Sequence, residues 1–253
     1  MNPTPPLQIT GVGKSFGDVT AIRRVDLELG DHEVLALVGP SGCGKSTLLR
    51  LMVGLLRPDA GTVLFDGEPL PHDAGALDRL RHRMGYVIQD GGLFPHLTAR
   101  ENVTLLARHL DRDDTGINER TRELAALVKL PIGALDRYPV QLSGGQRQRV
   151  GLMRALFLDP DVLLLDEPLG ALDPLIRADL QDDLRAIFRR LGKTVVLVTH
   201  DVGEAGFLAD TIVLLREGEV VQTGAVNDLV ERPAEPFVER FIRAQRSPVF
   251  DRT

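Results

Sequence analysis

The spacing of apolar residues changes several times along the chain, and each change predicts a different element. Residues 33–38, 161–165 and 194–198 are nearly continuous apolar runs, which are typical of strands buried on both faces. Residues 19–29 alternate between apolar and polar positions from Val25 onward, which predicts an antiparallel strand with one face in water. The chain is therefore expected to contain strands of two kinds, and the buried kind is typical of a parallel sheet covered by helices.

Helical spacing lies between these predicted strands. Apolar residues recur at helical intervals over residues 45–56, and the segment 57–61 ends that helix. Asp66-Gly67 marks a hairpin turn. Residues 94–158 are mostly helical in pattern, and a long helix runs over residues 174–191 from a proline, which is a favourable first residue. Strand, helix and strand in that order predict an α/β fold with a parallel sheet.

The amino-acid composition is typical of a globular protein, and the net charge argues against some classes of partner. Of the 253 residues, 43% are hydrophobic and 26% charged, so the chain can bury a substantial core. The 36 acidic and 30 basic residues give a net charge of −6, which argues against a nucleic-acid partner or an anionic membrane surface. The single cysteine excludes an internal disulfide framework and fits a reducing compartment.

The N-terminal residues lack the basic start and apolar core of a signal peptide. No apolar run reaches the roughly 18 residues that a membrane span needs. Any connection to a membrane is therefore expected to come through a partner.

A glycine-rich loop directly follows the apolar run 33–38 and opens the predicted helix. It reads Gly39-Pro40-Ser41-Gly42-Cys43-Gly44-Lys45-Ser46-Thr47. In that context the backbone N–H groups can point at phosphate oxygens, so Lys45 is predicted to reach the β- and γ-phosphates of ATP and Ser46 to bind Mg²⁺. The alternative is a chance glycine turn, which the flanking strand and helix argue against. The similar tract at 11–15 lacks this spacing and is expected to be a strand end and turn.

Two carboxylates, Asp166 and Glu167, follow the apolar run 161–165. A carboxylate at the C-terminal end of such a strand lies at the sheet edge where phosphates bind. Asp166 is predicted to hold a Mg²⁺-bound water and Glu167 to orient the attacking water, because phosphoryl transfer depends on in-line placement. The alternative is an acidic N-cap of the following turn.

A second small, glycine-rich turn, Ser143-Gly144-Gly145-Gln146, opens a predicted helix. By the same helix-terminus argument it is an anion site, with Ser143 as the N-cap. If the phosphate loop and the Ser143 turn are held apart in one subunit, they cannot both bind the same γ-phosphate. A head-to-tail pair of subunits solves this problem, since the turn of one copy can close over the phosphate loop of the other and form two composite ATP sites.

Together these segments resemble the ABC-type ATPases over residues 7–245. The resemblance implies that Gln89 contacts Mg²⁺ and the attacking water, that His200 contacts the γ-phosphate, and that Asp173 reaches across the dimer. Phe16 matches the aromatic residue that stacks on adenine, although this position is often Tyr in the family. Each residue also has a simpler explanation: the histidine as a packed or capping residue, the glutamine as solvated, and Phe16 as core.

The family resemblance implies one ABC ATPase domain over residues 1–253. Residues 1–93 and 159–253 would form the P-loop catalytic core with an N-terminal antiparallel β-subdomain, and residues 94–158 an inserted α-helical subdomain. Since one cassette is present without membrane spans, the resemblance implies a free-standing transporter subunit. It would act on the cytoplasmic face of the membrane with a second ATPase copy, integral membrane permease subunits and, indirectly, a solute-binding protein.

The segments 85–89, 92–98 and 169–175 resemble the osmoprotectant group, which imports glycine betaine, choline or related quaternary amines. Import of another small solute, such as an amino acid or sulfonate, and a soluble non-transport role stay open. The chain ends soon after residue 250, which leaves no room for the paired regulatory domain of longer members, so direct ionic-strength sensing is not expected.

Two further expectations concern single segments. Leu93, Phe94 and Leu97 follow Gln89 and are candidates either for docking a membrane subunit or for ordinary core. Cys43 lies beside Lys45 at a helix N-terminus, surroundings that favour a reactive thiolate.

Overall fold

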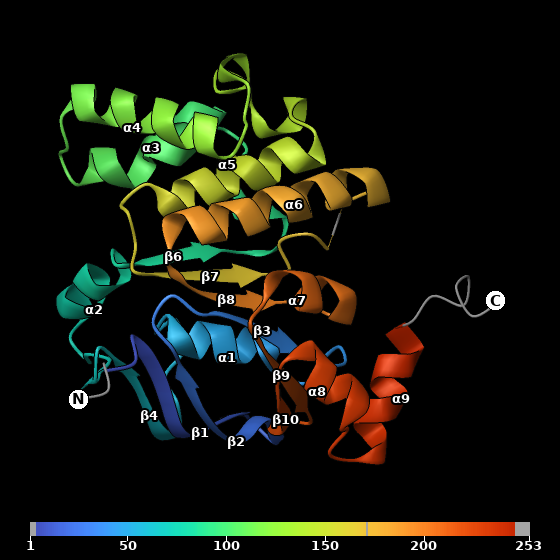
Figure 1. The fold of residues 1–253 in the computed structure, drawn as a ribbon. Helices are drawn as coiled ribbons and strands as arrows, with labels where there is room; N and C mark the ends of the chain where they lie inside the picture. The colour runs from blue at the N-terminus through green and yellow to red at the C-terminus, as the bar shows by residue number, and fades with distance from the viewer. Residues whose placement is uncertain (1–3, 171, 246–253) are drawn as a thin grey trace, which may run out of the picture. The chain divides into compact units, whose positions relative to one another are not determined.

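The computed structural model describes residues 4–170 and 172–245, apart from the side chain of Asp90. Ala171, in the segment that resembles the osmoprotectant group, lies outside the described residues. The chain divides into two compact units, Met1–Leu70 with Val196–Thr253 and Pro71–Val195 (Figure 1). The inner boundaries expected at residues 94 and 158 stay a prediction. No helix among the described residues has the length and apolar character needed to cross a bilayer.

The first unit is built on a mixed sheet. Its strands are β1 (Leu7–Phe16), β2 (Val19–Leu29), β3 (Val34–Val38), β4 (Ala60–Phe65), β5 (Glu68–Pro69), β9 (Thr211–Arg216) and β10 (Glu219–Gly224). Their order is β5-β4-β1-β2-β10-β9-β3, and β8 (Thr194–Val198) contains the boundary between the units. β1 pairs antiparallel with β2 and β4, whereas β3 runs parallel to β9. The predicted α/β class with an antiparallel N-terminal part is confirmed.

The turn between β4 and β5 shows how local sequence sets this sheet. Asp66 and Gly67 both have positive φ, 51° and 80°, as a tight hairpin turn requires. The flanking pairs Phe65–Glu68 and Leu64–Pro69 are in antiparallel register. The hairpin predicted from Asp66-Gly67 is confirmed.

Two expectations for this unit are wrong. The helix from Lys45, α1 (Lys45–Met52), ends before Leu56, because Val53 leaves the helical conformation and Gly54 has a φ of 69°. Residues 11–15 are not a strand end and turn but lie inside β1, where the register shifts and Gly11 has a φ of 59°.

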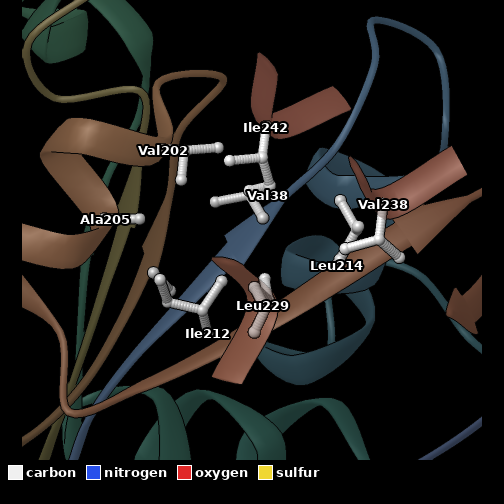
Figure 2. Close-up of a cluster of buried hydrophobic side chains, with 9 residues drawn as sticks. Val38, Val202, Ala205, Ile212, Leu214, Leu229, Val238 and Ile242 are labelled. Atoms are coloured by element: carbon white, nitrogen blue, oxygen red, sulfur yellow. The ribbon is translucent and has the colours of Figure 1, made fainter. Parts of the chain in front are cut away.

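Three helices, α7 (Val202–Leu208), α8 (Val226–Glu231) and α9 (Pro236–Gln245), pack on β3 and β9. Figure 2 shows the buried side chains that form this contact. The cluster contains Ala36, Val38, Val202, Ala205, Ile212, Leu214, Leu229, Val238 and Ile242. Val38 is the last residue of β3, so this apolar contact fixes the end of the strand from which the phosphate loop begins.

The second unit is mainly helical. Its helices are α2 (Ala74–Arg81), α3 (Ala99–His109), α4 (Asp114–Leu127), α5 (Gly144–Leu156) and α6 (Pro174–Leu191), with short 3-10 turns η1 (Gln89–Gly92), η2 (Ile132–Ala134) and η3 (Pro139–Gln141). β6 (Met84–Val87) and β7 (Val162–Asp166) form a parallel pair. The helical pattern expected over residues 94–158 is confirmed, as is the helix over residues 174–191 (Figure 1).

An ion-pair cluster around the buried Asp183 joins three segments of this unit. Asp183 on α6 accepts hydrogen bonds from Lys129, after α4, at 2.5 Å and from Arg149 on α5 at 2.6 Å. Burial alone would raise the pKa of Asp183, but the two cations outweigh burial and hold the pKa below its usual value of 3.8. Since the side chains of Arg149 and Asp183 are only 16% and 8% exposed, water screens the attraction between these two residues weakly.

We predict that Asp183→Asn lowers the free energy of unfolding by roughly 2–3 kcal/mol, because Arg149 would lose its charged acceptor in a buried site. Since the folded pKa lies below the unfolded value, the contribution of Asp183 is present above about pH 4 and is lost as pH falls through the folded pKa. Urea unfolding at a series of pH values measures both effects. Asp136→Asn is the matched control, because its pair with Arg100 is exposed and its loss should change stability much less. Equal losses for both variants would contradict the buried cluster.

Candidate functional site

The phosphate loop runs between β3 and α1 in the first unit. Gly39 and Gly44 have φ values of 150° and 108°, which other residues rarely adopt. A Cβ at Gly39 would lie 2.2 Å from the Leu215 carbonyl oxygen, and one at Gly44 would lie 2.6 Å from that of Ala21. Both glycines are therefore required by conformation and by packing. Pro40, Ser41, Gly42 and Cys43 lie between them, and Lys45, Ser46 and Thr47 form the first turn of α1.

Lys45 lies inside the curl of this loop. Its side chain is buried, and Nζ donates to the carbonyl oxygens of Gly39 at 2.8 Å and Pro40 at 3.0 Å. Both acceptors are neutral, so they solvate the ammonium without neutralising its charge. The loop thus holds a positive charge among backbone N–H groups at a helix N-terminus, as an anion site requires.

The surroundings of the Cys43 thiol differ from those expected. Cys43 is buried, and a Cβ placed on Gly39 would meet its sulfur at 2.8 Å, so the thiol is tightly packed. Burial raises the pKa of Cys43 and outweighs the opposite effect of Lys45. The expectation of a stabilised thiolate is wrong, because local sequence shows the cation but not the burial.

The catalytic carboxylates predicted at the end of β7 differ in their environments. Asp166 is the last residue of the strand and is buried, whereas Glu167 is half-buried. Glu167 has a φ of 46°, a left-handed conformation that is unfavourable for a residue with a side chain. This conformation does not by itself mark a functional position, since Asp66 in the β4–β5 turn also has a positive φ. The sequence contained no signal for this feature.

The turn Ser143-Gly144-Gly145-Gln146 opens α5 as predicted. Ser143 is the N-cap and exchanges hydrogen bonds with Gln146 in a capping box. Both glycines are packed against residues at the start of α6: a Cβ at Gly144 would lie 2.9 Å from Leu172, and one at Gly145 would lie 2.8 Å from Ile176.

Asp173 is the N-cap of α6 and accepts from the Ile176 backbone at 3.1 Å. The second unit therefore brings the predicted Ser143 turn and Asp173 together.

Gln89 is exposed at the start of η1, in the same unit. His200 is exposed in the first unit, directly after β8, and its carbonyl accepts from Gln245 at 2.8 Å. The preceding Thr199 donates its backbone N–H to Leu37 on β3 at 3.1 Å. His200 is therefore fixed by the strand that leads into the phosphate loop.

Phe16 ends β1 and is 48% exposed, with the Lys14 ammonium 5.6 Å from the ring centroid. Its exposure excludes the core explanation, and the Lys14 ammonium lies over one face of the ring. The predicted site residues are thus shared between the units. Phe16, the phosphate loop and His200 belong to the first, and Gln89, the Ser143 turn, Asp166, Glu167 and Asp173 to the second.

Sequence reasoning missed two polar side chains on α5, the buried Gln148 and the partly buried Arg154. Gln148 donates to the carbonyl oxygen of Pro168, the residue after Glu167. Arg154 donates to the carbonyl oxygens of Gly91 and Gly92, at the end of η1. The sequence offered one indication of these contacts. Both polar residues lie on the helix face that the apolar pattern assigns to the interior.

Comparison with known proteins gives a consistent picture. The sequence model of the ABC transporter family matches residues 22–170. The glycine betaine/carnitine/choline transport ATP-binding protein OpuCA of Bacillus subtilis is 43% identical over 95% of this chain and 63% of its own length. The sulfate/thiosulfate import ATP-binding protein CysA of Thermosynechococcus vestitus is 46% identical over 98% of this chain and 73% of its own.

A solved structure agrees with these relatives. The dimeric structure of MJ0796, a bacterial ABC transporter cassette, matches with a TM-score of 0.80 at 34% identity, covering 87% of this chain and 98% of that one. The chain spans about 63% of the length of the Bacillus subtilis relative.

We predict that Cys43 reacts with maleimide more slowly than a free cysteine at neutral pH, because the raised pKa lowers the thiolate fraction. The labelling rate should rise with pH and reach half its maximum above about pH 9. Mass spectrometry of the labelled protein, with free cysteine as the reference, measures both quantities. Bound Mg·ATP should slow the labelling further, since it covers the loop. Labelling as fast as that of free cysteine would contradict the buried thiol.

Proposed function

This chain belongs to the ABC transporter family, and on that premise we propose that it is the ATP-hydrolysing subunit of an importer that acts on the cytoplasmic face of the membrane. The observation that carries the proposal is the buried Lys45 ammonium, held by neutral carbonyls within a curled phosphate loop. A loop of this kind retains its full charge for the phosphates of ATP.

Each site residue receives a role in this proposal. Lys45 and the loop N–H groups bind the β- and γ-phosphates, and the exposed ring of Phe16 stacks on adenine. Glu167 orients the attacking water, and His200 contacts the γ-phosphate. In-line attack by an oriented water fits phosphoryl transfer, which needs positioning more than covalent chemistry.

The residues present suit Mg²⁺. Ser46, Gln89 and Asp166 supply hydroxyl, amide and carboxylate oxygens, the hard donors that this ion prefers. When bound with ATP, Mg²⁺ neutralises charge on the β- and γ-phosphate oxygens. The buried Asp166 would hold a Mg²⁺-bound water at the end of β7.

We propose that two copies of the chain form two composite ATP sites. The Ser143 turn of one copy would close on the nucleotide of the other, and Asp173 beside it would contact the partner. The capped helix N-terminus at Ser143 supports this role, because it presents backbone N–H groups and a partial positive charge. The solved relative MJ0796 is a dimeric cassette.

The permease subunits are proposed to dock on a groove in the second unit. This groove has a volume of about 530 Å³ and is lined by residues from α2, β6, α3 and α5. Leu105 and Leu106 on its rim are about 40% exposed, and Phe94 on the neighbouring loop is 44% exposed. Leu93 and Leu97 are partly exposed as well, which favours docking over the core explanation.

We propose a quaternary amine, such as glycine betaine or choline, as the transported solute. The similarity to OpuCA supports this assignment. Sulfate is the second candidate, because CysA is equally similar over a larger share of its length.

Glu167→Gln is predicted to bind ATP but to lose nearly all hydrolysis, on the order of a hundredfold or more in kcat, because the neutral amide cannot polarise water. Phosphate release by the purified protein with its permease measures this loss. With hydrolysis blocked, ATP should hold the variant as a dimer in size-exclusion chromatography. Near wild-type turnover would overturn the assignment of Glu167.

A double variant tests the composite site. Adding Ser143→Arg to Glu167→Gln should spare ATP binding to the monomer, since the phosphate loop is intact, but block dimer formation by placing a bulky side chain at the closing turn. An ATP-dependent dimer of the double variant would refute the role of the Ser143 turn.

The solute is tested by uptake into vesicles that contain the complete transporter with its binding protein. We predict ATP-dependent accumulation of radiolabelled glycine betaine or choline, with no accumulation when Glu167→Gln replaces the wild type. Accumulation of sulfate without either amine would overturn the solute assignment while leaving the ATPase assignment intact.

A further inference from the structure

The turn that carries Gln89 packs directly on helix α5. A Cβ placed on Gly151 would lie 3.1 Å from the Cα and carbonyl oxygen of Gly91, and one placed on Gly91 would lie 3.1 Å from the Arg147 carbonyl oxygen. Arg147, Gly151 and Arg154 are spaced by four and three residues, so they lie on one face of the helix. Only a helix face without a side chain at its centre allows the two backbones to approach so closely.

Arg154 closes this contact with two hydrogen bonds. Its Nη1 donates to the Gly92 carbonyl oxygen and its Nη2 to that of Gly91, each at 2.8 Å. Gly91 and Gly92 have φ values of 75° and 54°, so the chain turns sharply there and its carbonyls face the helix. A planar guanidinium matches two such acceptors, and lysine cannot reproduce this geometry.

The other end of α5 begins at the Ser143 turn. The helix contains 13 residues, and so it is about 20 Å long and behaves as a rigid rod. The N-terminal end of α5 therefore carries the Ser143 turn, which is proposed to close on the partner's nucleotide. The turn of Gln89 packs on α5 near its C-terminal end, at Gly151 and Arg154. Burial lowers the pKa of Arg154, but a guanidinium stays charged at physiological pH, so this clamp does not depend on protonation.

We propose that Arg154 is a positioning residue for Gln89. Arg154 holds the turn η1 on α5, so that Gln89 and the Ser143 turn move together as a rigid body. This inference rests on the proposed ATPase function. Arg154 also lines the groove between β6, α3 and α5, so a permease segment in that groove would contact the side chain that sets the position of Gln89. Stimulation of hydrolysis by the permease should therefore depend on Arg154.

The test is a double-variant cycle on the ATPase assembled with its permease. Arg154→Lys keeps the charge but loses the paired geometry, and we expect kcat to fall about tenfold, the effect of roughly one charge-assisted hydrogen bond. The KM for ATP should stay unchanged, because the phosphate loop is untouched. In a Gln89→Ala background the same substitution should have no further effect on kcat, since its action passes through Gln89.

Arg149→Lys is the matched control on the same helix. Arg149 binds Asp183 rather than η1, so its effect on kcat should be the same in both backgrounds. Equal effects of Arg154→Lys in the two backgrounds would overturn the inference. Wild-type kcat in Gln89→Ala alone would instead overturn the proposed role of Gln89, so the two failures are distinguishable.

Gly151→Ala provides an independent route that changes no charge. The added Cβ would push on the Gly91 backbone, so kcat should fall in the wild-type background and not in Gln89→Ala. Gly133→Ala is its control, because a Cβ there would meet nothing within 4 Å, and kcat should stay at the wild-type value. A wild-type kcat for Gly151→Ala, or an equal loss in both backgrounds, would overturn the inference even where Arg154→Lys fails to fold.

Discussion

The buried ammonium of Lys45 sets the requirements that the first unit meets. A buried cation is costly unless polar groups replace water around it, and here two loop carbonyls do so. Those carbonyls face the ammonium because the loop turns back at Gly39 and Gly44, where φ is positive. The turn is fixed by backbone of neighbouring strands, the carbonyls of Leu215 and Ala21, at positions where a Cβ would not fit. The backbone of β9 and β2 thus constrains the loop that surrounds the Lys45 ammonium.

In the second unit, helix α5 is the element on which the proposed site segments depend, as Lys45 is in the first unit. Polar side chains that are removed from water need hydrogen-bond partners, and the buried Gln148 and the partly buried Arg154 find them in backbone carbonyls. These carbonyls belong to the segments that follow Glu167 and Gln89. The same bonds therefore place the two segments proposed to be catalytic, and we expect a substitution that disturbs this packing to change catalysis before it unfolds the protein.

Local signals predicted most of the secondary structure. The helix over residues 174–191 begins at a proline and ends before Gly192, whose φ is 55°, so both ends were encoded by adjacent residues. The phosphate loop and the N-cap at Ser143 were equally local. The features that sequence did not predict depend on distant partners: the burial that raises the pKa of Cys43, the strain at Glu167, and the contact of Arg154 with Gly92, 62 residues away. No spacing rule reaches that far along the chain.

The two relatives described above are named for the transport of different solutes, yet their identities to this chain, 43% and 46%, are nearly equal. Their common requirement is the nucleotide, whose phosphates need the same loop, carboxylates and helix termini whatever solute is carried. In the docking mode proposed above, a permease presents a segment that fits the apolar groove beside Leu105 and Leu106. Arg154 lines that groove and binds the turn of Gln89, so a segment that fills the groove would contact the side chain proposed to position Gln89. Under this proposal, one contact through Arg154 would let the same cassette design respond to permeases of different specificity.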